Sequence, residues 1–455
     1  MSKSDSPALP LQNAPPKGSL GAIFLIILVD FMGFGLIIPL LPFFVPDYET
    51  QALKVTLIFA IFSICQFIGA PILGALSDRY GRRPVLILSQ VGSAAGYILL
   101  GVAATDFFHW SDTTRLGLVY LSRVIDGFTG GNVSIAQAYI SDVTDEKNRS
   151  KGMGLIGAAF GIGFSLGPAL GFLLVRIDPA LPGYAAAALA TWAALQTWAR
   201  LPESPIHKPT EVQHWLHPRT FAPVLKKPIV RQLLVISFVS MAAFVMMEAT
   251  CAIFLTDVFK WGAGLPDEAK RKVAGANTGL FFVYAGVIII IVQGGLIRRL
   301  TKKGIAAEWR LATIGPVLVT IGMALFIYLA WLPAMWVIAL AGLANATGRS
   351  FQGPTLSSLL SKYSDPRQQG AVFGLYHGLS SLARVAGPII AGLAYHMHPS
   401  LRETGQFWIA GAGLMLAAGW TAIIQKRAMR EPIAPAASPV IQPEATAQAA
   451  RAEMD

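Results

Sequence analysis

The stretch "FIGAPILGALSDRYGRRPVLILSQVG", residues 67–92, holds a short polar turn between two apolar runs. The turn is Asp78-Arg79-Tyr80-Gly81-Arg82-Arg83, with one carboxylate and three guanidinium groups. An apolar run of roughly 20 residues is long enough to cross the hydrocarbon core of a bilayer as a helix. The stretch therefore predicts two membrane-spanning helices joined by a charged loop that lies in water.

The same pattern recurs along the whole chain, which has 455 residues, 54% of them hydrophobic and 13% charged. An ordinary soluble domain is about 25% charged. Long apolar runs without sustained alternation are typical of membrane helices and not of a β-barrel. We therefore predict an all-α membrane protein with twelve spans, at residues 20–45, 55–77, 84–105, 116–141, 150–175, 183–200, 231–256, 273–297, 310–331, 334–359, 369–395 and 405–425.

The distribution of Lys and Arg predicts the orientation, because cytoplasmic loops carry the excess of positive charge. With the N-terminus inside, the inner segments hold 25 basic residues and the outer loops hold 8. Both termini are thus expected in the cytoplasm, and the protein is expected in the inner (plasma) membrane. The net charge of +11 then reflects topology and attraction to anionic lipid. We expect no nucleic-acid partner, although a basic balance alone does not exclude one.

An internal duplication organises the spans. A shift of 220 residues places Gly74 on Gly294, and "GALSDRYGRR" on "GGLIRRLTKK". Two parallel six-helix halves with a substrate site between them are a transporter architecture. We expect a monomer with these parts: a cytoplasmic tail 1–19, a six-helix bundle 20–200, a cytoplasmic linker 201–230, a second bundle 231–425 and a disordered tail 426–455.

The charged loop has two possible roles. It can be a basic topology signal, or it can be a latch whose charge contacts form in only one of two conformations. We favour the latch, because a topology signal needs neither the aspartate nor the glycine. The predicted gating residues are Gly74, Asp78, Arg79, Gly81, Arg82 and Arg83.

Four stretches carry a family resemblance. "GALSDRYGRR" (74–83) resembles the loop signature of the major facilitator superfamily at every fixed position. "GFSLGPALGF" (163–172) resembles the fifth-helix motif of proton-coupled drug antiporters, "LVDFMGFGLIIPLLP" (28–42) is similar to the first helix of tetracycline-efflux proteins, and "LSRVIDGFTGG" (121–131) to the family's fourth-helix Arg motif. The resemblance implies twelve helices, proton-driven drug export and no cofactor.

The fifth-helix motif consists of Gly163, Gly167, Pro168 and Gly171. Small residues at this spacing let helices approach closely, and proline bends a helix. The bend is either structural only or, as the resemblance implies, part of a seal against leak. "GFSLG" also fits a hydrolase nucleophile pattern, which requires a strand-to-helix turn and is discounted inside a helix. We expect no enzymatic activity and, from two isolated cysteines, neither a disulfide nor a metal site.

Ionisable residues at membrane depth are costly and indicate function. Asp30 lies in the first span with no basic residue nearby in sequence, so it is a candidate to take up and release protons; a structural hydrogen-bonded role is the alternative. Arg123 and Asp126, at i and i+3, can neutralise one another, either for coupling or only for structure. In the second half Glu248 is a further proton-site candidate, with Arg384 as its charge partner.

These features predict a proton-coupled antiporter that exports amphipathic, drug-like molecules. Proton-linked uptake of a small metabolite is the alternative, and would require more polar cavity walls. The ninth span lacks the acidic residue of tetracycline exporters, so the similarity does not extend to the substrate. The predicted cavity residues are Phe31, Phe34, Gln66, Asn132, Met246, Phe281 and Gln293.

Overall fold

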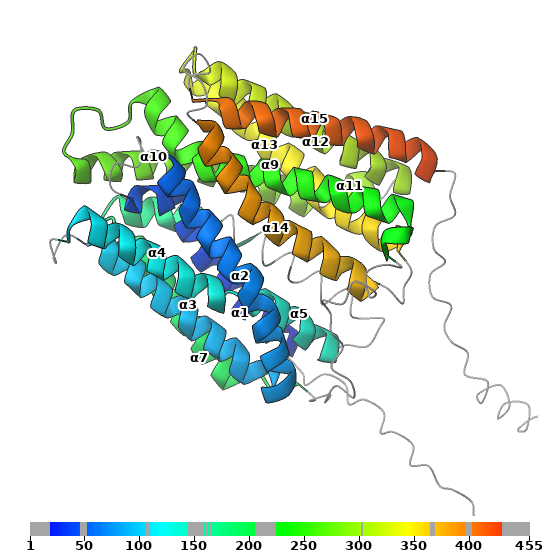
Figure 1. Ribbon diagram of the computed structural model, residues 1–455, viewed down its shortest axis with the longest axis horizontal. Helices are drawn as coiled ribbons and strands as arrows, with labels where there is room; N and C mark the ends of the chain where they lie inside the picture. Colours follow the sequence, from blue (N-terminus) through cyan, green and yellow to red (C-terminus); the bar gives the residue numbers. More distant parts are fainter. Residues whose placement is uncertain are drawn as a thin grey trace, which may run out of the picture.

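The computed structural model describes residues 19–45, 52–105, 110–143, 166–204, 224–301, 304–364, 369–395 and 403–429, together with Ile156, Ala159, Ile162 and Gly163. This part of the chain is helical and contains no strand. Figure 1 shows two blocks of helices, one from the first half of the sequence in blue and cyan and one from the second half in green to red. The predicted all-α fold class is confirmed.

The first half contains the following helices. They are α1 (Ser19–Ile37), the 3-10 helix η1 (Ile38–Phe44), α2 (Ala52–Tyr80), α3 (Arg82–Ala104), α4 (Asp112–Thr129), α5 (Asn132–Val143) and α7 (Leu181–Arg200). A helical segment of the fifth span runs over Leu166–Val175.

The second half contains α9 (Pro228–Phe259), α10 (Asp267–Ile291), the π-helical turn η2 (Val292–Leu296) and α11 (Ile297–Thr301). It continues with α12 (Ile305–Leu329), α13 (Met335–Tyr363), α14 (Gln369–Tyr395) and α15 (Gly405–Ala428). The last helix therefore extends three residues beyond the predicted boundary at 425.

Eight helices of the described part are long and apolar enough to cross a membrane. The other predicted spans correspond to α4 with α5, the segment Leu166–Val175, α7 and α13. α13 carries buried polar residues such as Asn345 and Gln352 along its length, which lowers its mean hydropathy. Large apolar side chains, among them Leu416 at 75% and Ile423 at 70% exposed, cover the outside. Such a surface suits hydrocarbon and not water, so the chain is a multi-pass membrane protein.

The fourth span departs from the prediction of one continuous helix over 116–141. It is interrupted at Gly130 and Gly131, between α4 and α5. The two consecutive glycines explain the break, because glycine weakens a helix interior. The corresponding region of the second half after the 220-residue shift, around Ser350, lies inside the continuous helix α13.

Candidate functional site

Asp30 lies where four helices of the first half meet. Its carboxylate oxygen Oδ2 accepts a hydrogen bond of 2.7 Å from Nδ2 of Asn132 on α5 and one of 3.5 Å from Nε2 of Gln90 on α3. The Gln90 amide oxygen in turn accepts from the Thr197 hydroxyl on α7 at 2.8 Å. Asp30 is thus held by neutral amide donors at the junction of α1, α3, α5 and α7.

The break in the fourth span frees backbone groups next to this network. In a membrane every such group needs a partner. Gln66 on α2 donates from Nε2 to the Gly130 carbonyl oxygen at 2.9 Å, and the Ser89 hydroxyl on α3 donates to the Thr129 carbonyl oxygen. At the start of α5 the amide of Val133 donates to Oδ1 of Asn132 at 2.9 Å. The break is therefore a stabilised feature, and Asn132, the first residue of α5, also binds Asp30.

Arg123 and Asp126 form the ion pair that their spacing predicts, with Nη1 of Arg123 3.1 Å from Oδ2 of Asp126. Both side chains are buried, at 1% and 3% exposed. The Arg123 guanidinium also lies 6.0 Å from the ring centroid of Phe62 and 5.7 Å from that of Tyr97. Its Nη2 has no hydrogen-bond partner within the described part of the chain. The Arg123 guanidinium thus has one carboxylate, the Ser122 hydroxyl and two aromatic rings around it.

Three charged residues near the middle of the second half, Glu248, Arg349 and Arg384, lie on α9, α13 and α14. Glu248 is buried on α9, and its Oε1 has no hydrogen-bond partner among the described residues. Arg384 on α14 and Arg349 on α13 both interact with it electrostatically. Arg349 lies at the middle of α13, 14 residues from each end of the helix.

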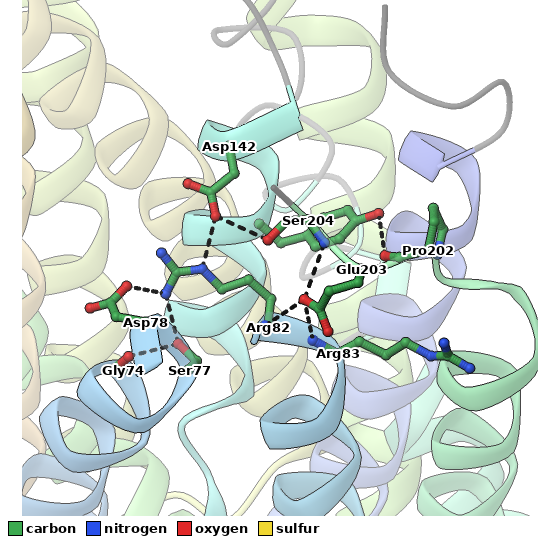
Figure 2. A network of polar contacts seen from close by, with 10 residues as sticks. Gly74, Ser77, Asp78, Arg82, Arg83, Asp142, Pro202, Glu203 and Ser204 are labelled. Carbon is green, nitrogen blue, oxygen red and sulfur yellow. Dashed lines mark hydrogen bonds and ion pairs between the residues drawn. The ribbon is translucent and has the colours of Figure 1, made fainter. Parts of the chain in front are cut away.

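The loop between α2 and α3 is organised around Arg82, as Figure 2 shows. Its guanidinium binds Oδ1 of Asp78 at 2.5 Å, Oδ2 of Asp142 at 2.9 Å and the hydroxyl of Ser77 at 2.7 Å. Ser77 in turn donates to the carbonyl oxygen of Gly74 at 2.7 Å. Because Asp142 lies near the end of α5, Arg82 links the loop to the broken fourth span.

Glu203, three residues after the end of α7, binds the other side of the same loop. Its Oε1 accepts hydrogen bonds from the backbone amides of Arg82 at 2.7 Å, Arg83 at 3.2 Å and Ser204 at 3.1 Å. Two of these amides begin α3, where a helix has unsatisfied donors and a partial positive charge. The start of the linker between the two halves is thereby fixed to the loop (Figure 2).

Gly81 makes this contact possible. Its φ of 102° is a conformation that side chains with a Cβ rarely adopt, and an added Cβ would lie 2.7 Å from Oε2 of Glu203. Arg83 donates to the carbonyl oxygen of Trp198 on α7. Arg79, by contrast, is exposed, and its guanidinium lies 5.3 Å from the ring centroid of Tyr80. Lys302 and Lys303, which correspond to Arg82 and Arg83 after the 220-residue shift, lie outside the described residues.

The fifth-helix glycines face α1. A Cβ on Gly163 would lie 2.6 Å from Cβ of Phe31, one on Gly167 2.6 Å from the backbone nitrogen of Leu36, and one on Gly171 2.8 Å from the carbonyl oxygen of Leu36. Pro168, next to Gly167, is buried in the same helical segment. These small residues therefore let the fifth span pack directly on the backbone of the helix that carries Asp30. Whether Pro168 also seals the pathway stays a prediction.

The predicted cavity residues fall into three groups. Gln66 and Asn132 belong to the polar contacts around the helix break. Met246 and Phe281 are buried, at 3% and 8% exposed, in an apolar cluster that contains residues of both halves. The remaining three are half-buried: Phe31 beside Gly163, Phe34 with its ring centroid 5.4 Å from that of Phe62, and Gln293 in the π-helical turn. Their contact with substrate stays a prediction.

Sequence reasoning did not find Gln90, Thr197, Asp142 and Glu203. The first two are polar residues inside apolar spans, a signal that could have identified them as partners of Asp30. Asp142 and Glu203 are separated from the loop by about 60 and 120 residues of sequence, and no local pattern connects them with it. Among the described residues, no group of three or more His, Cys, Asp or Glu side chains could hold a metal ion.

The two halves meet closely at the end of the molecule opposite the α2–α3 loop. Nζ of Lys272 at the start of α10 donates to the carbonyl oxygen of Ile177 at 3.1 Å. A Cβ on Gly279 would lie 2.9 Å from Cβ of Phe172, and one on Gly392 3.2 Å from Cα of Leu53 at the start of α2. These contacts join the ends of helices that lie far from residues 78–83.

A buried ion pair, a membrane-depth carboxylate and a charged loop in a duplicated helical bundle define a membrane transporter and not an enzyme. The family model "Major Facilitator Superfamily" matches residues 23–388, and the chain belongs to this family. The tetracycline resistance protein, class C, of Escherichia coli is 30% identical over 398 residues, covering 85% of this chain and 92% of that protein.

Solved structures of similar fold include the human organic anion transporter MFSD10 (TETRAN). It is 26% identical, has a TM-score of 0.62, and the match covers 90% of this chain and 99% of that one. A bacterial homolog of the human lysosomal transporter Spinster, in an inward-facing and unoccupied conformation, has a TM-score of 0.67 at 16% identity, covering 92% of this chain and 98% of that one. The second match supports the fold alone. Membership of this transporter family implies a small-molecule substrate.

Proposed function

We propose that the chain is a proton-coupled antiporter that exports amphipathic, drug-like small molecules by alternating access. It would reside as a monomer in the lipid of the inner (plasma) membrane, with both termini in the cytoplasm. The similarity to tetracycline resistance proteins supports the export direction. The described contacts between the halves, gathered at the end opposite the charged loop, suit a state closed on the outer side.

The environment of Asp30 carries the proposal. Its two hydrogen-bond partners, Asn132 and Gln90, are neutral amides. A carboxylate held this way can gain or lose a proton without breaking an ion pair. Asn132 is the first residue of α5, directly after the break in the fourth span. A change in the charge of Asp30 would therefore alter its hydrogen bond to the start of α5. Proton binding would thereby alter the packing of four helices.

The test is transport by Asp30→Asn in everted membrane vesicles, with a panel of fluorescent amphipathic dyes that includes neutral phenylnaphthylamine. Asparagine imitates a permanently protonated carboxyl group, so we expect proton-driven accumulation of dye to be lost while exchange of dye across the membrane persists. Asp112→Asn is the matched control, because Asp112 is exposed in the first turn of α4. An Asp30→Asn protein that still concentrates dye would show that another group couples the proton.

The vesicles also distinguish export from uptake. Exporters accumulate substrate in everted vesicles at the expense of luminal protons, whereas proton-linked uptake transporters drive substrate outward under the same gradient. Accumulation of a small polar metabolite only in vesicles of native orientation would replace the export proposal with the uptake alternative.

A further inference from the structure

The charges at membrane depth in the second half do not balance. Glu248 on α9 provides one carboxylate, and Arg349 on α13 and Arg384 on α14 provide two guanidinium groups within electrostatic reach of it. Neither arginine comes within ion-pair distance of an acidic side chain in the described part of the chain. In low-dielectric surroundings a charge without a close counter-ion is costly, and such charges are normally paired.

The arginine donors are also largely unused. A guanidinium has five N–H donors. Among the described residues these two side chains make one hydrogen bond, from Nη2 of Arg349 to the thioether sulfur of Met241 at 3.1 Å, a weak acceptor. The Arg349 guanidinium carbon also lies 4.6 Å from the ring centroid of Phe244. The guanidinium groups of Arg349 and Arg384 can therefore donate hydrogen bonds to a bound molecule, and that of Arg349 lies beside the ring of Phe244.

The three charged side chains are held near one another by tight helix packing. α14 approaches α9 so closely that a Cβ on Gly387 would lie 2.9 Å from the carbonyl oxygen of Ala242. Gly387 is three residues after Arg384, and Ala242 lies between Met241 and Phe244, the two residues that contact Arg349. Glu248 follows on α9 with an unpartnered, buried oxygen. Helices α9, α13 and α14 thus present a cationic group of residues at the middle of the second half.

We propose that Arg349 and Arg384 bind an anionic group of the transported molecule, a carboxylate, sulfonate or phosphate, while its apolar part lies against Phe244. Arginine suits this role, because its planar fork matches oxyanions and stacks on aromatic rings. The inference rests on the proposed export function and narrows its substrates to amphipathic organic anions. Glu248 competes with the substrate for the two guanidinium groups, so it keeps them partly compensated when substrate is absent.

The experiment compares two dyes that share an aromatic skeleton: anilinonaphthalene sulfonate, which is an anion, and phenylnaphthylamine, which is neutral. Binding to the purified protein in nanodiscs and transport in everted vesicles are measured for both. We expect Arg349→Gln and Arg384→Gln each to weaken binding of the sulfonate by about tenfold or more, the size of one lost charge-assisted hydrogen bond. Binding of the neutral dye should change less than about twofold. Glu248→Gln should strengthen binding of the sulfonate.

Arg176→Gln is the matched control. The Arg176 guanidinium also lies near an aromatic ring, 5.5 Å from the centroid of Phe172, but the side chain is exposed. We expect no change for either dye. Size-exclusion profiles show whether the variants fold. Because partly unfolded proteins expose apolar surface that binds aromatic dyes, the gain expected for Glu248→Gln must appear for the sulfonate and not for the neutral dye.

The outcomes separate this inference from the proposed function. If neither dye nor any other tested amphipathic molecule is moved by a proton gradient, the export function fails. If the neutral dye is exported and the arginine variants affect both dyes equally, or neither, the anion site is refuted and the export function stands. Unchanged or weaker sulfonate binding by a folded Glu248→Gln protein would also refute it.

Discussion

Replacing Gly81 with alanine tests whether the charged loop and the linker are held together by the Glu203 carboxylate. Two costs are expected. The backbone at φ 102° and ψ 153° is strained for any residue with a Cβ, at about 1–3 kcal/mol. The new Cβ would also occupy the place of the Glu203 carboxylate, 2.7 Å from Oε2.

The second cost follows from the hydrogen bonds that a displaced carboxylate gives up. Glu203 accepts from three backbone amides, of Arg82, Arg83 and Ser204. Because Glu203 is exposed, water offsets much of their loss, and we assign them together roughly 1–2 kcal/mol. Gly81→Ala should therefore lower the free energy of unfolding by about 2–5 kcal/mol in total.

Denaturant unfolding of the purified protein in detergent measures this value, and a double-mutant cycle with Glu203→Ala separates the two costs. In the Glu203→Ala background Gly81→Ala should retain only the strain of about 1–3 kcal/mol. Gly117→Ala is the control, because no atom lies within 4 Å of a Cβ at this position of α4. Helix propensity makes that change neutral or stabilising by up to about 1 kcal/mol. If Gly81→Ala behaves like Gly117→Ala, or if its cost is the same with and without Glu203, the reasoning is refuted.

Three further changes test other contacts. Asp78→Asn should reduce the rate of transport at least about tenfold while expression and membrane insertion, measured by fluorescence of a C-terminal fusion, stay normal, because Arg82 loses an ion pair but the positive charge remains; normal turnover would reduce the loop to a topology signal. Gln66→Met should lower the free energy of unfolding by about 1–3 kcal/mol, since the Gly130 carbonyl oxygen loses its donor; a neutral result in denaturant unfolding would contradict this role. Gly167→Ala should cost about 1–3 kcal/mol in the same assay, because a Cβ meets the backbone of Leu36 at 2.6 Å, and an unchanged stability would show that α1 can move away freely.

The fold was largely predictable because the signals are local. A span of about 20 apolar residues is set by the thickness of the bilayer, so α2, predicted over 55–77, begins and ends within three residues of that range, at Ala52 and Tyr80. The Arg123–Asp126 contact follows from helical spacing alone. The break at Gly130 was not predicted. The two glycines and the asparagine that follow one another there are visible in the sequence, but they lie inside a long apolar run, which by itself predicts one continuous helix.

The site was less predictable because its contacts join distant segments. Asp30 and Arg82 stood out in the sequence as charges in unusual places, whereas their contacts with Asn132 and Glu203 did not. Asn132 is 102 residues from Asp30, and Glu203 is 121 residues from Arg82. Such pairs arise only when the helices pack, and a neutral Asn or Gln in an apolar run is as easily a packing residue. Met246 and Phe281 show the converse, since hydrophobic composition does not distinguish a cavity wall from a packed core.

The two halves share one kind of contact and differ in charge. Asn132, which binds Asp30 from the fourth span, corresponds after the 220-residue shift to Gln352 on α13, and Gln352 donates to Ser240 on α9. Each half thus has an amide side chain that joins its fourth span to its first. The charges at membrane depth differ between the halves. The first half has two carboxylates and one arginine, namely Asp30, Asp126 and Arg123. The second half has one carboxylate and two arginines, namely Glu248, Arg349 and Arg384. A carboxylate held by neutral amides suits reversible protonation, whereas arginines with unused donors suit an anion. The same ancestral bundle would then provide the proton site in one copy and the substrate anion site in the other, and movement between the halves would couple the two.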